Sequence, residues 1–220
     1  MSILYIVATP IGNLEDISLR ALRVLRQVGL VAAEDTRTTR NLLGHFDIHT
    51  PLVAYTDAYQ RNQEARRQAV LDALGAGQDV ALVSEAGLPG VSDPGYQLVA
   101  AVLAAGHELV VVPGPSAVTT ALVASGLPCD RFLFVGFLPR KAAERRAFLA
   151  QLLDERATLV MFEAPHRLPA ALADLLATLG NRPAAVAREL TKRFEEVWRG
   201  RLAEAVAHFE QQPARGEITL

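Results

Sequence analysis

The segment from Ile3 to Asp16 reads Ile-Leu-Tyr-Ile-Val-Ala-Thr-Pro-Ile-Gly-Asn-Leu-Glu-Asp and opens with an uninterrupted apolar run. Such a run, bounded by Pro10 and Gly12, is typical of a strand that is buried on both faces. A helical pattern follows over residues 18–28, where leucine or valine recurs every third residue and Ser18 fits the N-cap position. The stretch therefore predicts a strand, a loop and a helix, which is the repeating unit of an α/β fold.

The same alternation continues along the chain. Further strands are predicted at 30–33, 51–55, 79–84, 108–112, 131–135, 157–162, 182–188, 194–199 and 217–220. Further helices are predicted at 36–45, 61–74, 94–105, 116–125, 141–152, 166–179 and 201–209. A break near 114–130 separates two α/β domains, which we place at 1–116 and 117–220. We expect a mostly parallel sheet in the first domain, a modestly different pattern after the break, and a cofactor cleft between the two domains.

The composition excludes several classes of protein. The chain has 220 residues, is half apolar and carries a net charge of −2, so RNA contacts would need local basic patches. Cys129 is the only cysteine, which excludes a disulfide framework and a multi-cysteine metal site. No apolar run reaches the roughly 20 residues of a membrane span, and the N-terminus lacks the basic region of a signal peptide. We expect a cytoplasmic protein that needs no metal.

Four loops follow predicted strands, where open α/β sheets bind ligands. They are residues 9–16, 84–95, 113–117 and 162–167. The loop 84–95 contains three glycines and two prolines, which favours a ligand-binding loop over a simple turn. Within it, Asp93-Pro94 is predicted to begin the next helix. Each of the other loops alone fits a plain connection equally well. The chain lacks the Gly-x-Gly-x-x-Gly, P-loop and Gly-x-Ser-x-Gly motifs, which disfavours a dinucleotide dehydrogenase, a P-loop NTPase and an α/β-hydrolase.

Several short motifs are spread over the whole chain. They are Tyr5–Asp16, Ala33–Arg37, Ser92–Tyr96, Pro113–Ala117, Gly136–Pro139, Pro165–Arg167 and Ala187–Lys192, followed by Phe194-Glu195-Glu196. Each motif alone is weak, but their order and number are specific. Together they resemble the tetrapyrrole methylase superfamily, and most closely its ribosomal RNA small subunit methyltransferase I branch.

This resemblance implies a fold, a cofactor and a substrate. The fold is two α/β domains with S-adenosylmethionine (AdoMet) bound in the cleft between them, not a classical Rossmann methyltransferase. The branch methylates the ribose 2′-oxygen of a cytidine in the decoding region of 16S rRNA, so the partner is the small ribosomal subunit, and the family is usually homodimeric. By position, the residues implied in cofactor binding are Pro10, Ser84, Glu85, Ala86, Gly87, Asp93, Ser116, Ala117, Gly136 and Phe162.

The chain departs from the family pattern in two places. The family usually carries aspartate and threonine where this chain has Glu85 and Leu88. The branch also usually continues for some tens of residues past the position of Leu220, so we expect the second domain to lack part of its C-terminal end.

Methyl transfer to a ribose hydroxyl needs a positioned base to accept its proton. Asp35, Asp93, Glu163 and Glu189 lie at predicted strand ends and are candidates, with Lys192 as an electrostatic helper. We favour Asp35 or Glu163, since Asp93 is expected to bind the cofactor, although a helix cap or an ion pair is the commoner role for each of these residues. Among local basic groups, Arg145 and Arg146 are predicted to contact RNA.

Two alternatives stay open. The first is a C-methyltransferase of the same superfamily that acts on a tetrapyrrole; Ala33–Arg37 and Ala187–Lys192 argue against it, since they match the rRNA branch. The second is a non-catalytic module that binds AdoMet or RNA, which the changes at Glu85 and Leu88 keep open.

Overall fold

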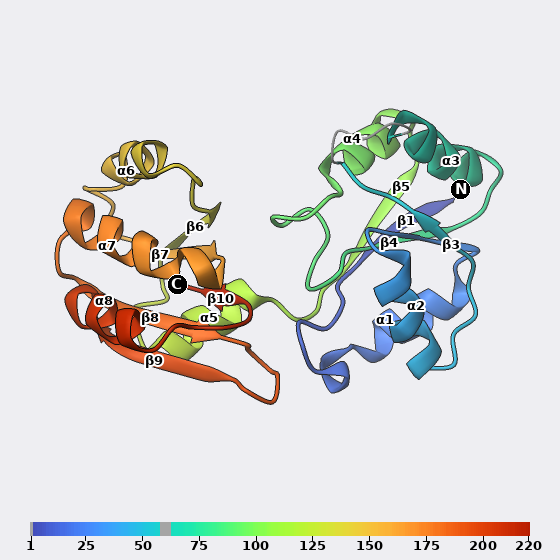
Figure 1. Cartoon of the computed structure of the whole chain (residues 1–220). Helices are drawn as coiled ribbons and strands as arrows, with labels where there is room; N and C mark the ends of the chain where they lie inside the picture. Colours follow the sequence, from blue (N-terminus) through green and yellow to red (C-terminus); the bar gives the residue numbers. More distant parts are fainter. Residues whose placement is uncertain (1, 58–62) are drawn as a thin grey trace. The chain divides into compact units, whose positions relative to one another are not determined.

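The computed structural model describes residues 2–57 and 63–220. The chain divides into two compact units, Met1–Ser116 (unit 1) and Ala117–Leu220 (unit 2). Within the described residues, each unit is built on its own five-stranded sheet (Figure 1). The α/β fold class is therefore confirmed.

Unit 1 has a parallel sheet of strand order β3-β2-β4-β1-β5. The strands are β1 (Ile3–Val7), β2 (Leu30–Ala33), β3 (Leu52–Ala54), β4 (Val80–Val83) and β5 (Glu108–Val112). The helices are α1 (Leu19–Gln27), α2 (Thr36–His45), α3 (Gln63–Gly75) and α4 (Tyr96–Ala104), with a 3₁₀ turn at Leu14–Asp16. Because all strands are parallel, their carboxyl ends and the loops that follow lie along one edge of the sheet.

Alternate side chains of the unit 1 strands enter two separate cores. Val7, Val31 and Val83 pack with α1 and α2, whereas Leu4, Ala32 and Leu82 pack with α3 and α4. Figure 1 shows these two helix pairs on opposite faces of the sheet. Burial on both faces explains why the strands read as continuous apolar runs and not as alternating ones.

Unit 2 has a mixed sheet of strand order β6-β7-β10-β8-β9. The strands are β6 (Phe132–Phe137), β7 (Thr158–Glu163), β8 (Pro183–Arg188), β9 (Glu196–Arg201) and β10 (Ile218–Thr219). The helices are α5 (Ala117–Ser125), α6 (Ala142–Ala150), α7 (Leu168–Leu179) and α8 (Leu202–Gln211), with a 3₁₀ turn at Pro165–Arg167. The parallel sheet predicted for the first domain is confirmed in unit 1. In unit 2 only β6 and β7 pair in parallel, and β8 and β9 form a hairpin that needs no crossover helix.

Two helix starts differ from their predictions. The helix expected to open at Asp93-Pro94 opens at Tyr96, with Gly95 at the N-cap and no capping side chain. Gly95 has a φ of +147°, and a Cβ there would stand 3.1 Å from the Gly90 nitrogen, so the chain turns sharply before the helix can start. The helix expected from His166 begins at Leu168, after the 3₁₀ turn. Residues 61 and 62, the predicted start of α3, lie outside the described residues.

Arg145 proves to be a core residue of unit 2. Its side chain is buried, and its Nη2 and Nε lie 2.6 and 2.8 Å from Asp174 Oδ2, which joins α6 to α7. The prediction that Arg145 contacts RNA is therefore wrong, because this guanidinium is already committed inside the protein. Arg146 pairs with the other oxygen of Asp174 at 3.2 Å and keeps a half-exposed side chain.

In the part of the chain that the structure describes, no helix is long and apolar enough to cross a bilayer.

Candidate functional site

The loops after β1 and β4 are joined by main-chain hydrogen bonds. The Thr9 N–H donates to the Gly87 carbonyl at 2.8 Å, and the Gly87 N–H donates back to the Thr9 carbonyl at 3.1 Å. Gly87 has a φ of +78°, a left-handed conformation that favours glycine. Pro10 is buried directly after this bridge. Two of the loops singled out in the sequence thus form one connected structure.

The loop between β4 and α4 is also hydrogen-bonded to the segment that follows β3. One oxygen of the Asp57 carboxylate accepts the Gly95 N–H at 2.6 Å, and the other accepts the Tyr55 hydroxyl at 2.6 Å. Burial, followed by the hydrogen bond to Asp57, raises the pKa of Tyr55 above its ordinary value, so this hydroxyl stays a donor. Leu88, at one departure from the family pattern, packs against the core that α3 and α4 cover.

The loop after β5 passes very close to β1. The Ala8 N–H donates to the Val112 carbonyl at 3.2 Å. A Cβ on Gly114 would stand 2.9 Å from the Ala8 Cβ, closer than real side chains come, so glycine is required there. Ser116 ends unit 1 two residues later. Three glycine-rich or proline-rich loops therefore meet at the carboxyl edge of this sheet.

A cluster of carboxylates lies at the same edge, and its central member is Glu34, directly after β2. Burial raises the pKa of Glu34, and repulsion from Asp93, Glu85 and Asp35 adds to this effect. The Glu85 N–H reaches Glu34 Oε2 at 3.5 Å. No ion pair to Glu34 is found among residues 2–57 and 63–220. Glu34 is thus a half-buried carboxyl whose pKa lies above its ordinary value.

Glu34 is a functional candidate that the sequence reading missed. It lies in the motif Ala33–Arg37 and follows a buried strand, so the signal for it was as strong as that for Asp35. What singles it out is the approach of Glu85 and Asp93, which are more than 50 residues away in the chain.

Asp35, one of the two favoured bases, caps α2. Its Oδ1 accepts the Arg37 N–H at 2.6 Å and the Thr38 N–H at 3.3 Å. These amides, led by that of Arg37, hold the pKa of Asp35 below its ordinary value. A carboxylate stabilised in this way is a weak proton acceptor, so its placement favours the capping role.

Glu163, the other favoured base, is enclosed at the end of β7. Its side chain is fully buried, with Oε1 3.1 Å from Arg167 Nε and 2.7 Å from the Ala164 nitrogen. The Arg167 Nη2 also donates to the Leu138 carbonyl at 2.6 Å. This arrangement favours a structural ion pair, since a buried and paired carboxylate offers no oxygen to a substrate.

Glu189 and Lys192 lie together in the loop between β8 and β9. Lys192 Nζ donates to Glu189 Oε1 and Glu217 Oε2, both at 3.0 Å, and the Glu217 N–H donates to Glu189 Oε1 at 2.9 Å. The bond from the Glu217 amide, followed by that from Lys192, lowers the pKa of Glu189. Although burial opposes it, the bonds to Glu217 and Glu189 raise the pKa of Lys192. The cluster is charged and ordered, and it holds this loop in shape.

The remaining predicted cofactor residues lie in unit 2. Ala117 is the first residue of α5. Gly136, with a φ of +69°, sits at the irregularity where the pairing of β6 and β7 shifts register. Phe162 packs its ring 4.9 and 5.4 Å from those of Phe134 and Phe137, the latter exposed. Phe134 and Phe162 are thus partly buried against the core beside α5, and Phe137 is the exposed ring of the three.

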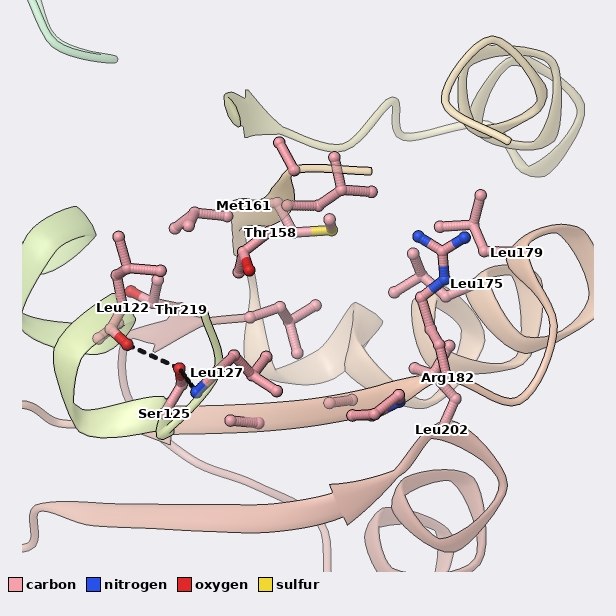
Figure 2. A pocket seen from close by; sticks show the side chains of 18 of the residues that line it. Leu122, Ser125, Leu127, Thr158, Met161, Leu175, Leu179, Arg182, Leu202 and Thr219 are labelled. Atoms are coloured by element: carbon pink, nitrogen blue, oxygen red, sulfur yellow. Dashed lines mark hydrogen bonds between the residues drawn. The ribbon is translucent and has the colours of Figure 1, made fainter. Parts of the chain in front are cut away.

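An apolar cavity of about 350 Å³ lies elsewhere in unit 2, and Figure 2 shows residues that line it. Leu122, Met161 and Leu175 are among them, and Ser125 is held by the Leu122 carbonyl and the Leu127 N–H. None of the predicted site residues lines this cavity. The described residues also contain no group of His, Cys, Asp and Glu that could hold a metal ion.

Comparison with known proteins identifies the family of the chain. Residues 3–206 match the family model described as Tetrapyrrole (Corrin/Porphyrin) Methylases. A protein of Synechocystis sp. named Ribosomal RNA small subunit methyltransferase I is 51% identical over all of this chain and 78% of its own length. The protein of the same name from Thermotoga maritima is 47% identical over all of this chain and 97% of its own length.

Solved structures match the fold at much lower identity. The uroporphyrin-III-C-methyltransferase of Thermus thermophilus is 24% identical with a TM-score of 0.69, covering 100% of this chain and 93% of that one. A cobalt precorrin-4 methyltransferase of cobalamin biosynthesis is 17% identical with a TM-score of 0.71, covering 99% of this chain and 93% of that one. At this identity the likeness extends to the fold only.

Proposed function

The chain belongs to the tetrapyrrole methylase family, and from that membership we propose that it transfers the methyl group of AdoMet to the 2′-oxygen of a cytidine ribose in the decoding region of 16S rRNA. The observation that carries this proposal is the identity of 47–51%, over the whole chain, to proteins named Ribosomal RNA small subunit methyltransferase I. On this proposal the chain acts on the small ribosomal subunit and is located in the cytoplasm. The homodimer that the family resemblance implies stays a prediction.

The residues of unit 1 fit the chemistry of AdoMet. The molecule carries a positively charged sulfonium and an ammonium group, and Glu34, Glu85 and Asp93 crowd negative charge at one edge of the sheet. A cation placed there would relieve their repulsion. A structure bound to S-adenosyl homocysteine is known for the uroporphyrin methyltransferase of Thermus thermophilus, which supports the same class of ligand here. We assign binding to the residues of unit 1 and unit 2 that the sequence indicated.

Those residues play different parts in the proposal. In unit 1, the backbone of Pro10, Ser84–Gly87 and Ser116 forms the cradle, and Glu85 and Asp93 supply charge. In unit 2, Ala117, Gly136 and Phe162 supply apolar contacts.

We assign the role of general base to Glu34. AdoMet supplies an electrophilic methyl group; the ribose oxygen forms a bond to it as the bond to sulfur breaks, and the hydroxyl proton must leave. A carboxylate with a raised pKa accepts that proton better than an ordinary one. Asp35 and Glu163 are committed to a cap and an ion pair, and Glu189 and Lys192 to each other, so Glu34 is the better-placed acceptor.

Two measurements test the proposal. Calorimetry with AdoMet tests the site, and labelled methyl transfer tests the substrate, using small subunits from a strain that lacks this methylation beside uroporphyrinogen III. We expect label on the 16S rRNA, resistant to alkali at one cytidine. Label on the porphyrinogen would instead assign a tetrapyrrole C-methyltransferase. AdoMet binding without transfer to either substrate would leave a non-catalytic binding module.

A further inference from the structure

The loop between β8 and β9 carries a largely exposed aromatic side chain. Phe194 is 65% exposed, although the loop around it is strongly polar. The Arg193 guanidinium lies 5.5 Å from the centre of the Phe194 ring. The pair therefore presents two planar groups together at the surface, a ring and a guanidinium.

The other charged side chains of this loop already have partners. Lys192 is bound by Glu189 and Glu217, the Arg188 Nε donates to Glu196 at 2.6 Å, and the Thr191 N–H donates to Glu195 at 2.5 Å. Arg193 has no ion pair among the residues that the structure describes. It is the cation of this loop that remains available to an anion.

The loop is held in one shape. Glu189 and Thr191 adopt left-handed backbone conformations, with φ of +49° and +66°. The Glu189 N–H donates to the Glu217 carbonyl at 2.9 Å, and Leu190 is buried beneath the loop. A flexible loop would lose entropy when its tip is bound, whereas a loop fixed by these bonds has already lost most of it.

We propose that Arg193 and Phe194 form a stacking platform for an unpaired base of the RNA substrate, with the guanidinium also contacting a phosphate. This inference rests on the proposed function and names a contact for that substrate. Proteins bind single-stranded RNA by stacking its bases on aromatic rings and guanidinium planes. An uncharged aromatic surface beside one unpaired cation fits such a base with its phosphate better than it fits a duplex, which needs many cations.

The test uses the full chain and a fluorescent single-stranded RNA dodecamer of the decoding-region sequence. Loss of one stacked base weakens binding by about 1–3 kcal/mol, or roughly 5- to 150-fold. We therefore expect Phe194→Ala to raise the Kd for RNA by that factor with the AdoMet affinity unchanged, and Phe194→Trp to retain tight binding. A plot of the logarithm of the RNA association constant against the logarithm of the salt concentration has a negative slope. Arg193→Ala should make this slope less steep by about 0.7. Leu153→Ala, at another exposed apolar residue of unit 2, is the matched control and should bind as the parent does.

Several outcomes would overturn the inference. It fails if Phe194→Ala binds RNA as the parent does, or if Phe194→Leu does, because leucine keeps an apolar surface but has no ring. It also fails if Phe194→Ala changes the sedimentation coefficient and not the RNA affinity, which would make the ring a contact between protein chains. The KM for small subunits separates the two proposals. If Phe194→Ala methylates small subunits at the parental rate and with an unchanged KM, the stacking platform is contradicted but the proposed methyl transfer is not. RNA binding that depends on Phe194 but transfers no methyl group supports the platform and defeats the proposed reaction.

Discussion

The ends of β2 and β7 each carry a glutamate, and the two have opposite surroundings. Glu163 is fully buried and paired with Arg167, whereas Glu34 is half-buried among Glu85, Asp93 and Asp35. A buried carboxylate with its cation is a structural element, because removing either charge leaves the other unpaired. A carboxyl surrounded by like charges is held closer to protonation and can exchange a proton with a ligand. The position at a strand end is therefore less informative than the charges around it.

The largest effect should come from removing the carboxyl of Glu34. Glu34→Gln should lower kcat for methyl transfer by about 10²–10⁴-fold, because a general base contributes that much. Single-turnover transfer to small subunits measures it. Asp35→Asn is the matched control, since asparagine caps a helix as well as aspartate does, and it should keep most of the activity. If Asp35→Asn lowered kcat more than Glu34→Gln did, Asp35 and not Glu34 would be the general base.

The ion pair at the other glutamate should matter to stability. Arg167→Met should lower the free energy of unfolding by about 3–5 kcal/mol, since Glu163 is left charged and buried without a cation. Urea denaturation followed by circular dichroism measures it. Adding Glu163→Gln to this variant should recover part of the loss. If Arg167→Met were as stable as the parent, the ion pair between Arg167 and Glu163 would not contribute to stability.

The pH dependence of stability should report the surroundings of Glu34. The pKa of Glu34 is raised in the folded protein, so its contribution to stability is present below the ordinary value of 4.5 and is lost as the pH rises through the folded pKa. Glu34→Gln should therefore melt higher than the parent above that range, by a margin that grows with pH and then levels off. Parental activity should rise over the same interval. Parallel melting curves from pH 4 to 8 would contradict the raised pKa.

The smallest effect should come from the tie between β3 and the β4–α4 loop. Asp57→Asn weakens the charge-assisted bond to the Gly95 N–H, so we expect a loss of about 1 kcal/mol, or roughly fivefold in AdoMet affinity by calorimetry. Tyr55→Phe removes the hydrogen bond from the Tyr55 hydroxyl to this carboxylate and leaves the bond to Gly95, so it serves as the control. If Tyr55→Phe weakens binding as much, the effect comes from general loosening of the unit and not from the position of Gly95.

Local features of the fold followed well from the sequence. The helix predicted at residues 36–45 is α2 with both of its ends, and Ser18 caps α1 by accepting the Ala21 N–H at 3.0 Å, as predicted. Both depend on neighbours within a turn of helix, which the sequence displays directly. The α/β class followed from the alternation of predicted strands and helices, and the family from the order of the motifs.

Contacts between distant segments did not follow. Arg145 has the spacing of a solvated helix face, and only the approach of Asp174, 29 residues away, buries it. Glu34 and Asp35 are neighbours in the sequence, and it is the folded structure that distinguishes them: Asp35 caps α2, whereas Glu34 lies beside Glu85 and Asp93. The antiparallel pairing in unit 2 was missed for a related reason: a short apolar run predicts a strand but not its direction.

The position of β1 within its sheet has a consequence for how the chain folds. β1 pairs with β4 on one side and with β5 on the other, so its second edge stays open until Val112 has been synthesised. Strand pairings between segments this distant in the chain slow folding, because the entropy of closing a long loop is lost before the strands can form stabilising hydrogen bonds. During translation, β1 is thus synthesised before the other strands of unit 1 but becomes fully paired only when β5, the last of them, is available.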